Sequence, residues 1–217
     1  MKEYTNNLIE SFFLKWPNLQ YLKENMRKSI ALMTINILSG GKVLICGNGG
    51  SASDSEHIAG ELLKEFYIKR PINYEFREKL IAAYGEEGRD MAGSLQGAIP
   101  AISLISQTGF LSAYGNDAKP ELSFAQEVFA YGKPSDMLIA ISTSGNAKNV
   151  CYAAMIAKSL DVFVLSLTGE DGGNLRKHSD VLLNVPEKET YLVQELHLPL
   201  YHLLCRGIEY EIFGEER

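Results

Sequence analysis

The chain has 217 residues, of which 46% are hydrophobic and 22% charged, and its formal net charge is −6 at pH 7. This length suits a single α/β domain, and the acidic balance argues against a general nucleic-acid surface, because phosphate backbones are bound by clustered Lys and Arg. No apolar run approaches the roughly 20 residues of a membrane-spanning helix, and the polar N-terminus lacks the apolar core of a secretory leader, so we expect a cytoplasmic protein without membrane or nucleic-acid partners.

The first 40 residues carry apolar side chains at helical spacing. Pro17 interrupts this pattern and Ser39–Gly41 ends it, so we expect an extension of two helices over residues 1–40, ahead of the first strand. The apolar stripe of these helices is wide enough to pack on another subunit.

Five short apolar runs then alternate with helical stretches. Runs of this length with little alternation are typical of strands covered on both faces, and crossover helices favour parallel pairing. The sequence therefore predicts an α/β fold, a three-layer αβα sandwich around a five-stranded parallel sheet. The final stretch, Thr190–Phe213, indicates a long helix with Thr190 as its N-cap. The predicted strands are Lys42–Cys46, Ala101–Ile105, Met137–Ile141, Val162–Leu167 and Val181–Val185.

One stretch, residues 64–98, differs in character from the rest of the chain. Pro71 is expected to stop the preceding helix, and charged side chains dominate the remainder of the stretch. We interpret it as a surface insertion within a single domain over residues 1–217, rather than as a linker between two domains.

The most informative segment runs from Lys42 to Glu61. An apolar strand is followed by Gly47-Asn48-Gly49-Gly50-Ser51, whose small residues let backbone N–H groups surround an anion at a helix N-terminus. His57 and Glu61 then stand at i and i+4, on one face of the helix. The pattern places an anion-binding turn beside a possible acid/base or metal pair, which favours chemistry on a small phosphorylated molecule.

A second turn supports this interpretation over a dinucleotide site. Gly47 to Ala52 also matches GxGxxA, but that fingerprint expects a carboxylate at the end of the next strand, which here ends in Gln107. Ser142-Thr143-Ser144-Gly145-Asn146 follows the third strand and places hydroxyls beside another helix N-terminus. Two such turns in one parallel sheet favour a neutral phosphate site.

Five motifs, in order, resemble those of the sugar isomerase (SIS) domain family. The chain is most similar to the phosphoheptose isomerase branch, over nearly its whole length. This resemblance implies conversion of sedoheptulose 7-phosphate to heptose 7-phosphate through an enediol, in a homotetramer with active sites at subunit interfaces. The motifs are Gly47-Asn48-Gly49-Gly50-Ser51-Ala52, His57 with Glu61, Gly115-Asn116-Asp117, Ser142-Thr143-Ser144-Gly145-Asn146 and Gln194-Glu195-Leu196-His197.

The resemblance assigns a role to each matching residue. Glu61 would be the catalytic base and His202 the acid. The metal, Zn²⁺ in several members of the branch, would be bound by His57, Glu61, Gln194 and His202. The phosphate would be held by Ser51, Ser142 and Ser144, and the other substrate-binding residues would be Asn48, Gly49, Gly50, Asn116, Asp117, Thr143, Asn146 and Gln194.

The spacing of the C-terminal residues leaves an alternative open. Gln194 and His202 are eight residues apart, which is about 12 Å along a continuous helix. Spacing alone pairs Gln194 with His197, at i+3. Retaining His202 therefore implies an irregularity near Gln194 or a site shared between copies.

Two departures from the branch leave other functions open. Gln107 stands where the heptose isomerases usually carry Asp, and Ala147 stands where they carry a further Ser. These changes remove a carboxylate near the sugar and a hydroxyl near the phosphate. The alternatives are an isomerase of another sugar phosphate, or a non-catalytic adaptor resembling replication-initiator-associating proteins.

Overall fold

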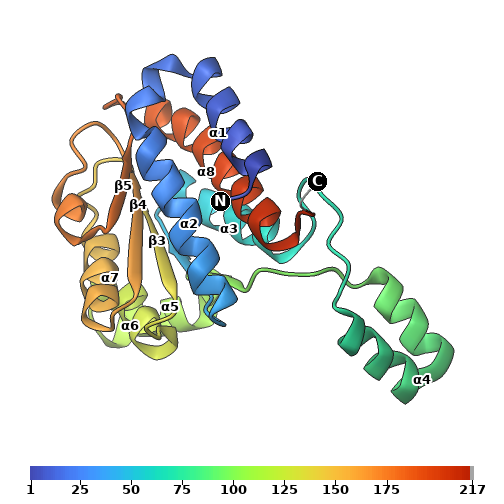
Figure 1. Ribbon diagram of the computed structural model, residues 1–217. Coiled ribbons are helices and arrows are strands. Elements are labelled where there is room, and N and C mark those ends of the chain that lie inside the picture. The colour runs from blue at the N-terminus through green and yellow to red at the C-terminus, as the bar shows by residue number, and fades with distance from the viewer. Residues whose placement is uncertain (216–217) are drawn as a thin grey trace.

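The computed structural model describes residues 1–215 and confirms the predicted α/β fold (Figure 1). Five parallel strands form one sheet in the order β2-β1-β3-β4-β5. Each strand begins and ends within two residues of its predicted run. The strands are β1 (Val43–Cys46), β2 (Ala101–Ser103), β3 (Met137–Ser142), β4 (Phe163–Thr168) and β5 (Val181–Asn184).

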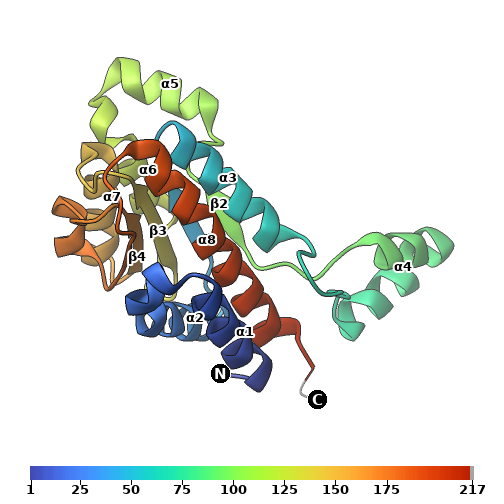
Figure 2. The same ribbon diagram turned by 90° about the horizontal axis from the view of Figure 1, so that it is seen from above.

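Helices cover both faces of the sheet, and Figure 2 shows the two layers from above. One layer holds α1 (Glu3–Lys15), α2 (Lys23–Leu38), α3 (Gly50–Leu63) and α8 (Thr190–Phe213). The other holds α5 (Thr108–Asp117), α6 (Ser123–Tyr131) and α7 (Lys148–Ser159). The architecture is therefore the predicted three-layer sandwich.

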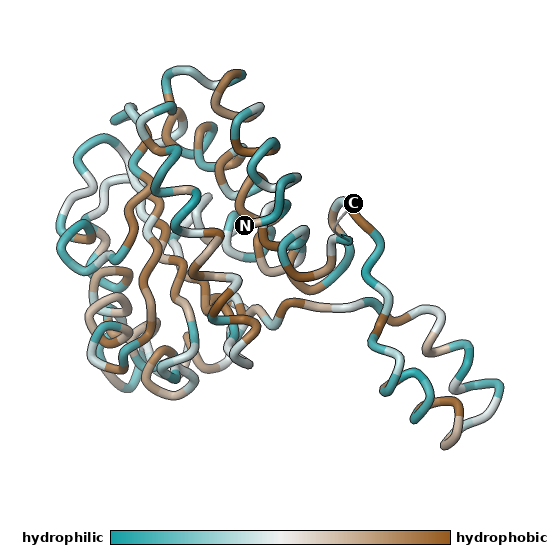
Figure 3. The backbone as a smooth tube through the Cα atoms, in the orientation of Figure 1, coloured by the Kyte–Doolittle hydropathy of each residue, from teal (hydrophilic) through white to brown (hydrophobic). Residues whose placement is uncertain are grey.

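The central strands of the sheet are apolar and buried on both faces. β1 and β3 are buried along their whole length, and in Figure 3 the strands form the hydrophobic centre of the domain. Because successive side chains point to opposite faces, Ile45 and Ile139 pack under α1, α2, α3 and α8, whereas Leu44 and Leu138 pack under α6 and α7.

The predicted N-terminal helices are present. Pro17 ends the first helical pattern and opens a 3₁₀ segment, Pro17–Leu22, that joins α1 to α2. Ile9, Phe13 and Met33 are buried in the core shared with α8. The extension is therefore part of the domain core.

Residues 64–98 leave the domain and return to it. α3 ends at Leu63, so the prediction that Pro71 stops this helix is wrong by eight residues. The helical stretch α4 (Tyr74–Ser94) is divided at Gly85, whose φ of 58° reverses the chain. The two halves form a hairpin, here called the arm (residues 74–94), which projects away from the sheet in Figures 1 and 2.

The C-terminal helix spans the predicted range without a break. Thr190 is its first helical residue rather than its N-cap; Glu189 occupies that position and makes no side-chain cap bond. Pro199 lies inside the helix between Gln194 and His202, and α8 continues through it. None of the helices in the described part of the chain is long and apolar enough to cross a membrane.

Candidate active site

The two serine-containing turns lie side by side. β1 and β3 are neighbours in the sheet, with Cys46 paired to Ala140, so the turns that follow them meet at the same edge. The side-chain amides of Asn48, in the first turn, and Asn149, at the start of α7, donate to each other's oxygens at 2.9 Å. This pair joins the two turns.

The first turn presents backbone amides at the start of α3. Gly49 has a φ of 56°, a conformation that glycine adopts without strain, and Gly50 begins the helix. Within residues 1–215 the amides of Gly49 and Gly50 donate to no backbone or side-chain acceptor. Ser51 follows in the first helical turn and is buried. Free amides and the positive end of the helix dipole suit an anion.

The second turn is held by its own side chains. The Asn146 amide nitrogen donates to the Ser144 carbonyl at 2.9 Å, and its oxygen accepts the Asn174 amide at 3.0 Å. Ser142 is buried at the end of β3, whereas Ser144 is exposed. The side chain of Asn146 therefore shapes the loop, and the Ser144 hydroxyl also takes part in it by accepting the Asn146 backbone amide at 3.1 Å.

The Ala147 departure has a visible structural consequence. Ala147 occupies the N-cap position of α7, where it offers no side-chain hydrogen bond. A serine at this position would place a hydroxyl at the helix N-terminus. The second turn consequently has fewer hydroxyl groups than the family pattern predicts.

α3 and α8 run parallel in close contact. The Gln194 side chain lies against Gly50, where an added Cβ would stand 2.5 Å from its Nε2 atom. Seven residues further along both helices, the Tyr201 hydroxyl lies 3.0 Å from His57 Nδ1. The anion-binding turn and the groups near His57 are thus two ends of one helix pair.

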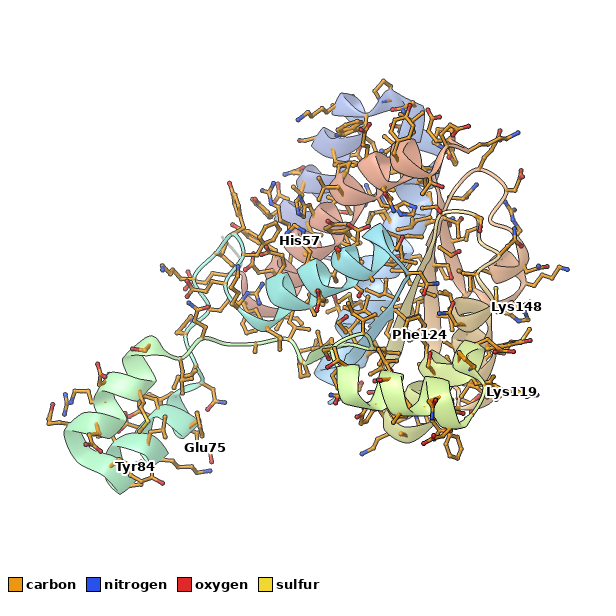
Figure 4. All side chains as sticks on the ribbon, turned by 180° about the vertical axis from the view of Figure 1, so that it is seen from behind. His57, Glu75, Tyr84, Lys119, Phe124 and Lys148 are labelled. Atoms are coloured by element: carbon orange, nitrogen blue, oxygen red, sulfur yellow. The ribbon has the colours of Figure 1, made fainter. Side chains whose placement is uncertain are left out.

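The acid/base candidates gather at the far end of this pair. Nε2 of His57 lies 3.3 Å from the Glu61 Oε1 atom. The rings of His57 and His202 are nearly perpendicular, with centroids 5.1 Å apart, and Phe66 packs against His202. Figure 4 shows His57 on α3, with Glu75 and Tyr84 of the arm far from it. The structure therefore brings together three of the four predicted metal ligands.

The environment keeps His202 neutral near pH 7. Burial lowers the pKa of His202, and the nearby His57 adds to this effect, whereas Glu61 opposes it. The Nε2 atom of His202 is buried and has no hydrogen-bond partner among residues 1–215.

Gln194 and His197 lie elsewhere on α8. The Gln194 side chain reaches the first turn, two helical turns before His202. His197 is fully buried against the sheet; its Nε2 atom lies 3.2 Å from the Thr168 carbonyl oxygen, and burial lowers its pKa to about 4. The pairing of Gln194 with His197, suggested by spacing alone, is therefore not a shared site.

The Gly115-Asn116-Asp117 motif is not a turn. These residues form the last part of α5, and Asn116 and Asp117 are exposed. The Asn116 side chain donates to Asp117 at 2.8 Å. In the described chain, no hydrogen bond joins either side chain to the two turns. Gln107, the other departure, is exposed at the start of this same helix.

Two residues that sequence reasoning missed belong to the surroundings of His57: Tyr201 contacts it, and Asp54 contacts Tyr201. Tyr201, which is 1% exposed, places its hydroxyl beside the ring, and this hydroxyl donates to Asp54 Oδ1 at 3.2 Å. Asp54 lies one turn before His57 on the same face of α3, a spacing that could have identified it. Tyr201 is adjacent to His202 in the sequence, but only the packing of α8 on α3 brings it to His57.

The side chains around His57 are of the types that bind zinc in proteins. Among residues 1–215, no three His, Cys, Asp or Glu side chains form a complete metal-binding cluster. However, His57, Glu61 and His202 supply two imidazoles and a carboxylate, which are ligand types that zinc takes. The unpartnered Nε2 atom of His202 is consistent with such a ligand. These three residues agree with zinc in ligand type alone, and Gln194 of the same chain lies two turns away.

Comparisons with known proteins identify homologues over the full length of the chain. The SIS domain family model matches residues 107–204. A phosphoheptose isomerase from Shewanella halifaxensis is 35% identical over 219 residues, which cover 100% of this chain and 98% of the relative. Another, from Shewanella loihica, is 36% identical over 198 residues, covering 90% and 87%.

Solved structures agree with the sequence matches. The phosphoheptose isomerase from Neisseria gonorrhoeae superposes with a TM-score of 0.72 at 34% identity, covering 92% of this chain and 93% of that one. The enzyme from Francisella tularensis gives a TM-score of 0.73 at 29% identity, covering 94% and 95%. Matching sequence, fold and paired turns show that the chain belongs to the phosphoheptose isomerase family of SIS-domain proteins.

Proposed function

We propose that the protein converts sedoheptulose 7-phosphate to heptose 7-phosphate through an enediol intermediate. The observation that carries this proposal is the arrangement of α3 and α8. One end of this helix pair presents free amides and a buried serine, and the other end presents a carboxylate and two imidazoles. A phosphosugar bound by its phosphate would therefore extend along the helices toward the acid/base groups.

The phosphate site supplies binding energy and orientation. Ser51 and Ser142, the amides of Gly49 and Gly50 and the N-terminus of α3 would bind the dianion without a Lys or Arg. His57 lies six residues beyond Ser51, a rise on the order of 9 Å. An extended seven-carbon sugar can span that distance. Holding the phosphate would fix the carbonyl end near His57, which lies about one helical turn before Glu61.

Glu61 and His202 divide the proton transfers. The Glu61 carboxylate takes the proton from the carbon next to the carbonyl and returns it to the neighbouring carbon. His202, kept neutral by burial, would hydrogen-bond to the enediolate oxygens, giving a proton to the former carbonyl oxygen and taking one from the hydroxyl of the neighbouring carbon, as a neutral imidazole can do. Phe66, packed on His202, helps to exclude water from this end of the site.

Zinc binding and self-association complete the proposal. His57, Glu61 and His202 would hold zinc, which when bound polarises sugar oxygens. Metal ligation competes with proton transfer by Glu61 and His202, so both roles require that the substrate alter the coordination. Because Gln194 cannot reach these residues in its own chain, its separation supports a site completed between copies of a homotetramer. Exposed Leu14, Leu38 and Leu198 supply apolar surface for such contacts. The three cysteines are buried and free, which suits the reducing cytoplasm.

The direct test is turnover of sedoheptulose 7-phosphate by the purified protein, followed as aldose formation. Glu61→Gln and His202→Ala should each abolish most of the activity, whereas Glu56→Gln, an exposed carboxylate on α3, should not. Full activity in both site variants would remove these residues from the mechanism. Absence of turnover and of thermal stabilisation by any sugar phosphate would instead favour a non-catalytic adaptor.

A further inference from the structure

Tyr201 connects Asp54 to His57 across the contact between α3 and α8. The tyrosine hydroxyl lies 3.0 Å from His57 Nδ1 and donates to Asp54 Oδ1 at 3.2 Å. Asp54 and His57 are three residues apart on one face of α3. A single hydroxyl on α8 therefore contacts two polar side chains on the facing helix.

The number of hydrogen-bond donors and acceptors on these three side chains fixes the direction of both hydrogen bonds. Burial raises the pKa of Asp54, and the Tyr201 hydroxyl donates its one proton to the Oδ1 atom of this carboxyl group. The hydroxyl oxygen then has only lone pairs to offer to His57. His57 must carry its proton on Nδ1, which leaves Nε2 as the atom that faces Glu61 at 3.3 Å.

We infer that Tyr201, oriented by Asp54, is a positioning residue that holds His57 in its Nδ1–H form and directs Nε2 toward Glu61. The inference rests on the proposed function, in which His57 serves the site through Nε2. With its proton on Nδ1, a neutral His57 presents a lone pair at Nε2 beside the Glu61 carboxylate, so the two acceptors can share a cation, either a proton or a metal ion. Such second contacts to a metal-binding imidazole fix its ring orientation and its tautomer.

The burial of Tyr201 indicates that this arrangement is rigid. Its side chain is 1% exposed, and its ring packs edge-on against both His57 and His202, at centroid distances of 5.4 and 5.0 Å. A buried tyrosine hydroxyl needs a partner, and Asp54 and His57 are its partners here. Tyr201 thus sets the positions of both imidazoles.

Two variants separate the hydrogen bond from the packing. Tyr201→Phe keeps the ring and removes the hydroxyl. It should lower kcat and zinc affinity by roughly 10- to 100-fold, the usual effect of losing such a contact, with KM unchanged. Asp54→Asn keeps an acceptor oxygen for the hydroxyl and should therefore retain more activity than Asp54→Ala. Tyr21→Phe is the matched control, because it removes a tyrosine hydrogen bond to the Asn184 carbonyl, far from the site.

The decisive readout is the tautomer of His57 in the full-length, metal-free protein. The chain has only four histidines, so long-range ¹H–¹⁵N spectra can assign each imidazole, with His57→Ala identifying the relevant signals. Wild-type protein should show a proton on Nδ1 of His57. Tyr201→Phe should lose that fixed tautomer, and Tyr21→Phe should keep it.

The spectra test the inference separately from the proposed function. A wild-type Nε2–H tautomer, or unchanged spectra and zinc affinity in Tyr201→Phe, would overturn the positioning role. A wild-type protein without isomerase activity would reject the proposed function. In that case the Nδ1–H tautomer and its loss in Tyr201→Phe would still support the positioning role.

Discussion

Arg70 and Glu209 form an ion pair with no solvent exposure, in which Nε and Oε1 are 2.7 Å apart. Arg70 also donates to the carbonyl oxygens of Leu62 and Glu61, and Glu209 accepts the amides of Phe66 and Tyr67. The pair therefore joins the end of α3, the base of the arm and α8. It also fixes the backbone of the proposed catalytic carboxylate.

Arg70→Met is expected to destabilise the fold strongly. It leaves the Glu209 carboxylate buried without its cation, a change that typically costs about 3–5 kcal/mol. The neighbouring Lys69 pairs with Glu65 on the surface, with 91% of its side chain exposed. Lys69→Met should therefore cost about 1 kcal/mol or less. Urea unfolding of the two variants measures the difference, and similar midpoints would contradict this role for Arg70.

Gly50→Ala should weaken substrate binding more than it affects stability. The new methyl group would displace the end of the Gln194 side chain, which is flexible enough to move. KM for the phosphosugar should rise because the turn changes shape. Gly60→Ala is the control on the same helix: its Cβ would meet no atom within 4 Å, so it should stabilise α3 by about 0.5–1 kcal/mol. Thermal unfolding and steady-state kinetics distinguish the two variants.

Ser51→Ala should raise KM roughly 10-fold and leave kcat unchanged. A hydrogen bond to a charged group contributes about 1.5–3 kcal/mol, and a phosphate remote from the reacting carbons is bound equally in the ground and transition states. The control is Ser53→Ala, because Ser53 is exposed on the same turn of the helix. A fall in kcat without a rise in KM would place Ser51 in the chemical step rather than in the phosphate site.

His197 should make the fold less stable as the pH falls. Burial lowers its folded pKa to about 4, below the ordinary value of about 6.5. Between these values the unfolded chain binds one more proton, so stability falls as the pH decreases through this window, by on the order of 3 kcal/mol in total. His197→Gln should remove this dependence. Urea unfolding between pH 7 and 4 measures it, and parallel curves for the two proteins would disprove the assignment.

Glu127 should have the opposite dependence. Its carboxylate oxygens are buried and unpartnered in the described structure, and burial raises its pKa to about 7. Above pH 4.5, the ordinary pKa of a glutamate, the unfolded chain releases the Glu127 proton, whereas the folded protein retains it up to about pH 7. Stability is therefore lost as the pH rises from 4.5 through 7. Glu127→Gln, which resembles the protonated form, should be more stable than wild type at pH 8 and similar to it at pH 4. Equal stability at pH 8 would contradict a buried acid.

Most of the sheet could be predicted because its signals are local. Apolar runs set the strands, and Gly49 and Gly145 mark the turns that follow β1 and β3. The arm was not predicted as helical because its sequence is dominated by charged residues and lacks an extended apolar stripe. Its fold depends on the reversal at Gly85 and the contact of Gly88 with the Leu80 carbonyl, where a Cβ would come within 2.1 Å.

The site was predictable only where its residues share one element. His57 and Glu61 could be paired by their helical spacing, whereas Tyr201 reaches His57 across 144 positions of sequence. The Gly115-Asn116-Asp117 motif could not be assigned to an element from sequence, because local composition does not show that α5 continues through it. The other residues of the site are brought together by contacts between segments that are distant in the sequence, which local patterns do not show.

The parallel alignment of α3 and α8 also defines a molecular ruler. Gln194 meets the first turn and Tyr201 meets His57, so two independent contacts fix the helices in one register. Sliding by a single turn, about 5.4 Å, would break both. In the proposed mechanism, the separation between the phosphate site and the acid/base groups is therefore constant. The carbon-chain length of the sugar phosphate would then be a basis for substrate selectivity, because the protein backbone holds the two ends of the site at a fixed distance.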